Sequence, residues 1–469
     1  MTPSEQLLGD SVFPRLKALV IEVTGMAFYA DKDLDLAQII ADRMEQCRIS
    51  DCAAYLELLQ ADGEEMDCLV AELTIGETYF FRHKEQFDAL REIVLPDILA
   101  RNTPSRRLRI WSAGCATGPE PYSLAILLKR EFGAQILGWH VSILGTDINQ
   151  KFLSRARDGR YDQWAFRATP ENIRGECFVP VGKQWQIRPE FKAMVSFQYH
   201  NLTRNRFPSI TDNIAGFDII ICRNVVIYFS RETVEALVPC FHESLVDGGW
   251  LVMGHAEPNM ELFRDFRTVN CPGAVLYQRT SVEPQPIRPP QRHVVAPSLP
   301  LPVQQRMARR LQPQSPRPSP SPALALAMAS PPTSVAVSPP LSEVRHLADQ
   351  GKWDAALRAC DAVLGKDSLN WRGHYLRALI LDQMGDGDAC ESALRRAIYL
   401  DRRAVLPHYH LGLFLLRAEE AEAARRSFRN VLALLGGEAD DRAVDEGEDL
   451  TAGQLRETVG MHMKVIGIS

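Results

Sequence analysis

The stretch Ser112-Ala-Gly-Cys-Ala-Thr-Gly-Pro-Glu-Pro-Tyr-Ser123 decides the fold. The strand pattern Leu108-Arg-Ile-Trp-Ser precedes it, and a helical pattern over 122–132 follows it. Gly114 and Gly118 would allow the backbone to approach a ligand closely, and the helix N-terminus would favour negative charge nearby. A glycine pair alone is equally consistent with a tight connection. The order of strand, turn and helix nevertheless predicts the first unit of an α/β fold.

The pattern continues on both sides of this unit. Strands are predicted at 139–144, 194–199, 217–222 and 250–253, with a helix at 232–245 before the last of them. The run Phe217-Asp-Ile-Ile-Ile-Cys222 is apolar throughout, as is typical of a parallel strand buried on both faces. This alternation predicts a doubly wound, Rossmann-like sheet with helices on both faces over residues 76–280.

Two acidic residues indicate what such a turn would bind. Asp147 ends the second strand, where a carboxylate can accept both hydrogen bonds of a ribose diol. It lies 29 residues beyond Gly118, farther than the roughly 20 typical of dinucleotide folds. Glu120, just inside the turn, would repel a pyrophosphate and attract a cationic amine. The pair therefore favours S-adenosylmethionine (SAM), with its amino-acid tail, over NAD.

Composition divides the rest of the 469-residue chain. Residues 1–75 show helical apolar spacing and carry 15 acidic against 5 basic side chains, so a small, acidic all-α domain is expected. Residues 281–340 contain 16 of the 30 prolines, no aromatic residue and a net charge of +5, and are predicted to be a disordered linker. Residues 441–469 are expected to be an acidic, mobile C-terminal tail.

Residues 341–440 repeat at an interval of 34 residues. Gly351 corresponds to Gly385, and His374-Tyr375 to His408-Tyr409. Small residues at fixed positions allow paired helices to pack closely, and three units suffice for a stable stack. The region resembles three tetratricopeptide repeats, which implies an all-α domain and protein partners; any array of helical hairpins is the alternative.

Four segments together resemble the CheR family of chemoreceptor glutamate methyltransferases. They are Glu77-Thr-Tyr-Phe-Phe-Arg82, Gly114-Cys-Ala-Thr-Gly-Pro-Glu-Pro-Tyr-Ser123, Gly145-Thr-Asp-Ile148 and Cys222-Arg-Asn-Val-Val-Ile-Tyr-Phe229. The resemblance covers about residues 10–280, and the appended repeats are similar to the subgroup that includes WspC. It implies SAM-dependent methylation of glutamates on a chemoreceptor-like protein, S-adenosylhomocysteine as product, and a surface-sensing pathway that controls biofilm formation.

The resemblance also implies roles for individual residues. Arg82 and Tyr228 would lie at the methyl-transfer site, and Glu120 and Asp147 would hold the methionine amine and the ribose. The further positions that match the family's cofactor pocket are Thr78, Arg82, Gly114, Asn201, Leu202, Arg223 and Asn224. The family also carries a small β-subdomain that touches the receptor, expected here at about 157–199.

Two features depart from the family pattern. Gly76 stands where the family often has Asn, so one side-chain contact with the cofactor is lost or replaced. The family's N-terminal helices are often basic where they meet the receptor, whereas residues 1–75 have a net charge of −10. That difference puts the usual docking surface in doubt.

Several classes of protein are excluded or disfavoured. No apolar run approaches the ~18 residues of a membrane-spanning helix, and Glu5 and Asp10 do not fit a signal peptide. The ten cysteines form no CxxC pair or zinc spacing, so we expect reduced thiols, a cytoplasmic location and no metal. A net charge of −6 disfavours nucleic-acid binding. A degenerate SAM-binding scaffold that acts through its repeats remains the alternative to an enzyme.

Overall fold

The computed structural model describes residues 2–280 apart from Asp62 and Pro258, and residues 340–467 apart from Glu419, Glu448 and Asp449. The linker expected at 281–340 lies outside the described residues except for Pro340.

The N-terminal part is helical, as its apolar spacing predicts. Its helices are α1 (Pro3–Leu8), α2 (Phe13–Thr24), α3 (Asp33–Cys47), α4 (Cys52–Ala61) and α5 (Gly63–Leu73), with a short 3-10 turn at Ala27–Tyr29. The buried Glu65 carboxylate accepts hydrogen bonds from Arg43 Nε (3.1 Å) and from the Tyr55 hydroxyl (2.7 Å). These bonds link α3, α4 and α5, so the charge of this buried carboxylate is compensated.

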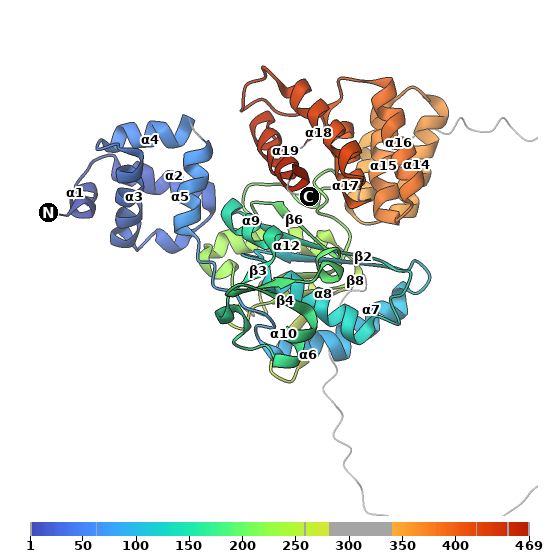
Figure 1. Ribbon diagram of the computed structural model, residues 1–469, viewed down its shortest axis with the longest axis horizontal. Helices are drawn as coiled ribbons and strands as arrows, with labels where there is room; N and C mark the ends of the chain where they lie inside the picture. Colours follow the sequence, from blue (N-terminus) through green and yellow to red (C-terminus); the bar gives the residue numbers. More distant parts are fainter. Residues whose placement is uncertain are drawn as a thin grey trace, which may run out of the picture. The chain divides into compact units, whose positions relative to one another are not determined.

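The central domain is built on a seven-stranded sheet with the order β6-β2-β1-β7-β8-β10-β9. Figure 1 labels β2, β6 and β8 of this sheet. The first five are parallel, and β10 runs antiparallel to β8 and β9. The strands are β1 (Arg107–Ala113), β2 (His140–Asp147), β6 (Val195–Tyr199), β7 (Phe217–Cys222), β8 (Leu245–Met253), β9 (Phe266–Cys271) and β10 (Ala274–Arg279). Chain order reverses between β1 and β7, and open α/β sheets bind ligands outside the carboxyl ends of strands at such a point.

Each face of this sheet has its own apolar core. On one face Ile110 and Ile219 pack with apolar residues of α6, α7, α8 and α9; on the other, Trp111 and Ile220 pack with α12. The helices are α6 (Lys84–Ala89), α7 (Leu95–Asn102), α8 (Pro119–Phe132), α9 (Gln150–Asp158) and α12 (Arg231–Ser244), with a π-helical turn at Leu90–Val94. The predicted doubly wound sheet is therefore confirmed.

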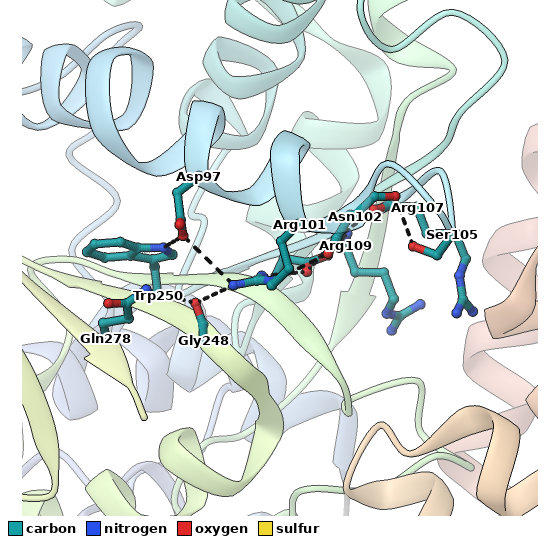
Figure 2. A network of polar contacts seen from close by, with 10 residues as sticks. Asp97, Arg101, Asn102, Ser105, Arg107, Arg109, Gly248, Trp250 and Gln278 are labelled. Carbon is teal, nitrogen blue, oxygen red and sulfur yellow. Dashed lines mark hydrogen bonds and ion pairs between the residues drawn. The ribbon is translucent and has the colours of Figure 1, made fainter. Parts of the chain in front are cut away.

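A polar network fixes α7 to the amino-terminal half of the sheet (Figure 2). The buried Asp218 carboxylate of β7 accepts hydrogen bonds from the backbone N–H of Arg109 (2.9 Å) and from Asn102 Nδ2 (2.8 Å). Arg101 also donates to Asp218, and to the Gly248 carbonyl at 2.6 Å. The network lies far from the carboxyl ends of the strands, so it holds the scaffold of the site and not the site itself.

A second, three-stranded sheet lies within the segment where a small β-subdomain is expected. Its order is β3-β5-β4, with antiparallel pairing. The elements here are β3 (Arg160–Tyr161), a 3-10 turn (Gln163–Phe166), α10 (Glu171–Cys177), β4 (Phe178–Val181), β5 (Gln184–Ile187) and α11 (Pro189–Lys192). The hydrophobic Trp164, Val179 and Val181 are exposed on it.

The C-terminal part contains three successive helix pairs. They are α13 (Leu341–Asp349) with α14 (Trp353–Lys366), α15 (Trp371–Met384) with α16 (Gly387–Leu400), and α17 (Val405–Arg417) with α18 (Ala421–Leu435). Gly351 and Gly385, at equivalent places in successive repeats, have φ angles of 70° and 75°. This left-handed conformation favours glycine, which explains why the residue recurs.

The end of the chain differs from the mobile tail that its acidic composition suggests. Residues Ala452–Gly467 form helix α19. Leu455 and Val459, one helical turn apart, are fully buried in the core of the repeats. Apolar burial of this kind stabilises a helix whatever the charge of the segment before it.

Candidate functional site

The glycine-bearing turn follows β1 at the carboxyl edge of the sheet. Gly114 and Gly118 have φ angles of 74° and 92°. A Cβ at Gly114 would lie 2.3 Å from Val225 Cγ2, and one at Gly118 would lie 2.9 Å from Ala156 Cβ. Both glycines are therefore required by the packing of the protein itself. From the sequence alone, this reason could not be distinguished from close approach of the backbone to a ligand.

A buried ion pair lies beside this turn. Arg223 Nε, after β7, is 2.6 Å from Glu120 Oε2 in the first turn of α8. The hydroxyl of Ser112 donates to Glu120 Oε1 at 2.7 Å. Arg223 Nη1 also donates to the Arg82 carbonyl (2.7 Å) and to Gln86 Oε1 (2.8 Å). Residues far apart in the sequence thus place a carboxylate and a guanidinium side by side.

Asp147 is held at the end of β2 by backbone donors. Its Oδ2 accepts from the N–H of Ala116 (2.8 Å) and its Oδ1 from that of Asn149 (2.9 Å). Burial raises the pKa of the carboxyl from 3.8 to about 6, although these hydrogen bonds favour the charged form. The backbone N–H of Ile148 also favours the charged form, so of about four acceptor sites on the carboxylate at least one remains for a ligand.

The segment Glu77–Arg82 lies against the same ion pair. Arg82 Nη1 donates to the Glu77 carbonyl (2.8 Å), and the N–H of Phe81 donates to Ser123 Oγ (3.0 Å). Among the described residues, no carboxylate pairs with Arg82, which is half-buried. Thr78 is also half-buried in this segment.

Tyr228 lies within electrostatic range of Arg82. Burial raises the pKa of its hydroxyl, and the positive charge of Arg82 opposes that shift. The ring packs edge-on against Phe28 of the N-terminal helices, with centroids 5.6 Å apart. The guanidinium of Arg82 is therefore close enough to the Tyr228 hydroxyl to affect its pKa.

Asn224 and Asn201 differ in whether their side chains have hydrogen-bond partners among the described residues. Asn224 has φ 59°, and its buried Oδ1 has no hydrogen-bond partner within the described part of the chain. Asn201 is engaged, because its Nδ2 donates to the Val23 carbonyl (2.8 Å) and its Oδ1 accepts from Thr203. Leu202 is buried in the core of the sheet. An unpartnered buried acceptor at Asn224 fits a ligand that supplies a donor.

The departure at Gly76 has a structural reason. A Cβ at this position would lie 2.3 Å from the ring of Phe152. Phe152 therefore fills the space that a side chain at position 76 would need.

Glu257 is a component of the site that the sequence did not reveal as one. Its Oε1 accepts from the N–H of Val225 (3.1 Å) and its Oε2 from that of Gly254 (2.5 Å). Burial raises its pKa. The carboxylate ties the loop after β8 to the loop that carries Asn224 and Tyr228. Its partners are backbone N–H groups, which every residue except proline has. The sequence therefore contains no pair of side chains that would indicate this role.

Cys115, Cys222 and His255 lie at or just beyond the carboxyl ends of β1, β7 and β8. Cys115 and Cys222 are buried, and burial raises the pKa of both thiols well above the usual value, as expected of small apolar fillers. His255 is exposed and stacks on His83 with centroids 4.4 Å apart.

Metal and membrane features can be stated for the part of the chain that the structure describes. There, no group of three or more His, Cys, Asp or Glu side chains could hold a metal ion. In the same residues, no helix is long and apolar enough to cross a membrane.

An open parallel sheet with a carboxylate at the end of β2 and an acid–guanidinium pair at the first turn defines a nucleoside-cofactor-binding α/β protein. Residues 76–275 match the family model "CheR methyltransferase, SAM binding domain", and residues 11–74 match "CheR methyltransferase, all-alpha domain". The chain belongs to the CheR methyltransferase family, and it is a SAM-dependent methyltransferase.

Curated relatives cover different shares of the chain. A chemotaxis protein methyltransferase of Listeria monocytogenes is 36% identical over 203 residues, which is 43% of this chain and 73% of that protein. The "Probable biofilm formation methyltransferase WspC" of Pseudomonas aeruginosa is 27% identical over 399 residues, 83% of this chain and 91% of that protein. The chain is therefore WspC-like in its domain arrangement. A solved structure of the Yersinia enterocolitica chaperone SycD covers 27% of this chain and 81% of its own, with 16% identity and a TM-score of 0.24.

Proposed function

We propose that the protein transfers the methyl group of SAM to glutamate side chains of a chemoreceptor-like, methyl-accepting protein, giving a methyl ester and S-adenosylhomocysteine. The observation that carries this proposal is the site around the Glu120–Arg223 pair. Glu120 and Arg223 form a buried ion pair, and Arg223 also donates to the carbonyl of Arg82, which has no carboxylate partner among the described residues. Together with Asp147 at the end of β2, these residues would form the cofactor site.

The pocket residues match the charge pattern of SAM. Its amino-acid tail is zwitterionic, so Glu120 would hold the ammonium group and Arg223 the carboxylate. Asp147 would accept hydrogen bonds from the ribose diol, and the unpartnered Asn224 Oδ1 is a further acceptor. Gly114, Thr78, Asn201 and Leu202 would line the pocket, with Asn201 contributing through its backbone because its side chain is engaged.

The reaction needs no general base. A glutamate acceptor is already ionised at neutral pH, since the pKa of an unperturbed glutamate side chain is about 4.3. The sulfonium of SAM supplies an electrophilic methyl group. The protein's task is to align the acceptor carboxylate and to remove part of its water. Arg82 and Tyr228 would orient that carboxylate.

The receptor substrate, the biofilm-related pathway and a cytoplasmic location belong to this proposal. Support comes from the chemotaxis and biofilm methyltransferases to which the chain is similar. The appended helix pairs would dock protein partners. The remaining alternative is a SAM-binding scaffold with little or no turnover.

Turnover separates the enzyme from the scaffold. The purified chain is mixed with SAM and the cytoplasmic domain of a methyl-accepting receptor, and S-adenosylhomocysteine is quantified. We expect repeated turnovers that require the receptor domain. SAM binding without product would favour the scaffold.

The Asp147 carboxyl predicts how cofactor affinity depends on pH. A ribose diol donates to the charged carboxylate, so the ligand binds the form that exists above the raised pKa of about 6. The affinity for S-adenosylhomocysteine should be constant above about pH 7 and fall by up to tenfold per pH unit below about pH 6. Calorimetry across this range is the measurement. Asp147→Asn should bind weakly at every pH, and an unchanged wild-type affinity at about pH 5 would refute the ribose role.

Glu257 is proposed as a positioning residue. Glu257→Ala removes the acceptor of several backbone N–H groups, so the loop with Asn224 and Tyr228 should shift and kcat should fall by about 100-fold. Glu257→Gln keeps one acceptor oxygen and should restore part of kcat. The control is Glu261→Ala, which removes an exposed carboxylate paired with Arg231. Equal kcat values for Glu257→Ala and Glu261→Ala would exclude this role.

A further inference from the structure

A groove of about 700 Å³ lies between the second helices of two successive repeats, α16 and α18. Helix α17 forms its floor through Leu411 and Leu415, and Ile398 and Ala423 line its sides. No residue predicted at the methyl-transfer site contributes to it.

The helices that form the groove are held in place by side-chain packing on the sides that face away from it. A Cβ at Gly412 of α17 would lie 2.6 Å from the ring of Phe428 of α18, so these two helices are in close contact beneath it. On another side of α17, His410 packs edge-on against Tyr375, with ring centroids 5.6 Å apart. The groove is therefore a preformed feature of the packed repeats.

The charged side chains that line the groove are all positive. Its lining contains three arginines, Arg395, Arg402 and Arg426, and no carboxylate. Arg395 is bound to Glu391 of its own helix at 2.6 Å. Arg402 and Arg426 are exposed, and neither pairs with a carboxylate within residues 340–467 as far as these are described. Positive charge thus flanks an apolar floor.

We propose that this groove binds an acidic protein segment in which carboxylates alternate with apolar side chains. The apolar side chains would cover Leu411 and Leu415, and the carboxylates would pair with Arg402 and Arg426. Such charge-assisted pairs add specificity as well as affinity. The inference deepens the proposed docking role of the repeats and does not depend on methyl transfer.

The charge and the apolar floor of the groove favour this occupant over two others. The chain's own segment 281–340 has a net charge of +5, so it is repelled by the same arginines. A nucleic acid would satisfy the arginines through phosphates but would leave the apolar floor uncovered. Tyr399, whose side chain is 68% exposed at the rim, adds apolar surface suited to side chains.

The test uses the full chain and a short fluorescein-labelled peptide of alternating leucine and glutamate, with fluorescence anisotropy as the readout. A matched peptide carries glutamine for glutamate. The groove variant is Arg402→Glu with Arg426→Glu. The control is Arg403→Glu with Arg429→Glu, which changes the same net charge at exposed neighbours that do not line the groove.

We expect the acidic peptide to bind at least about tenfold more tightly than the glutamine peptide, and the groove variant to lose that difference. The control variant should bind nearly as the wild type. Equal binding of the two peptides, or equal loss in both variants, would overturn the proposal. Retained SAM binding by the groove variant keeps this result separate from the proposed catalytic function.

Two further results would indicate that the groove binds a different partner. Tighter binding of a single-stranded oligonucleotide than of the acidic peptide would assign it to nucleic acid. Self-association of the chain in sedimentation equilibrium, abolished in the groove variant only, would assign it to the acidic residues 1–75 of a second copy. Either result contradicts the proposed partner.

Discussion

Replacing Arg82 with alanine is expected to lower the rate of methyl transfer by about 1000-fold, at the upper end of what the loss of one preorganised donor group costs. Arg82 is half-buried beside the cofactor pocket and has no carboxylate partner among the described residues. Its guanidinium donates to the Glu77 carbonyl through Nη1, so its other donors remain for an acceptor carboxylate. Single-turnover transfer to a receptor domain is the measurement.

The control for Arg82→Ala is Arg82→Lys, which keeps the charge but lacks the planar fork. It should recover only part of the rate, since a lysine cannot orient a carboxylate in the same bidentate way. Affinity for S-adenosylhomocysteine should change less than the rate in both variants. Near-normal transfer by Arg82→Ala would remove Arg82 from the reacting centre.

Replacing Arg223 with alanine should destabilise the central domain by about 3–5 kcal/mol, because it leaves the Glu120 carboxylate buried without its ionic partner. The Arg82 carbonyl and Gln86 Oε1 lose the same donor. Cofactor binding should be lost as well. The free energy of unfolding is measured by urea titration, followed by the fluorescence of the tryptophans.

Arg231→Ala is the matched control. Arg231 pairs with Glu235 and Glu261 and is 57% exposed, whereas the Arg223 side chain is 4% exposed. Exposed ion pairs contribute little to stability because water screens them, so Arg231→Ala should have little effect. A similar loss of stability in the two variants would show that burial of the Glu120–Arg223 pair does not matter.

The fold could be predicted because its signals are local and periodic. The apolar run Phe217–Cys222 and the turn after Ser112 each predict a parallel strand, and this prediction does not require the order of the strands in the sheet. Glu120 and Asp147 could also be placed, since residues after the ends of neighbouring parallel strands meet at one edge. The 34-residue spacing likewise predicted the helix pairs.

Other parts of the site depend on contacts between residues that no sequence pattern links. Glu257 acts on backbone N–H groups more than 30 residues away in the chain, at Val225. The absence of a side chain at Gly76 is explained only by the ring of Phe152. Helix α19 does not follow from the acidic composition of residues 441–469, because the burial of Leu455 and Val459 in the core of the repeats stabilises it.

The measurement that most directly tests the central claim is the chemistry of the labelled product. The chain is incubated with tritium-labelled SAM and the cytoplasmic domain of a methyl-accepting receptor, and the receptor is then treated with mild alkali. A methyl ester on glutamate should release its label as volatile methanol, and a receptor with glutamine at the acceptor positions should take up none. Label that resists alkali, or that persists in the glutamine-substituted receptor, would contradict transfer to a glutamate carboxylate.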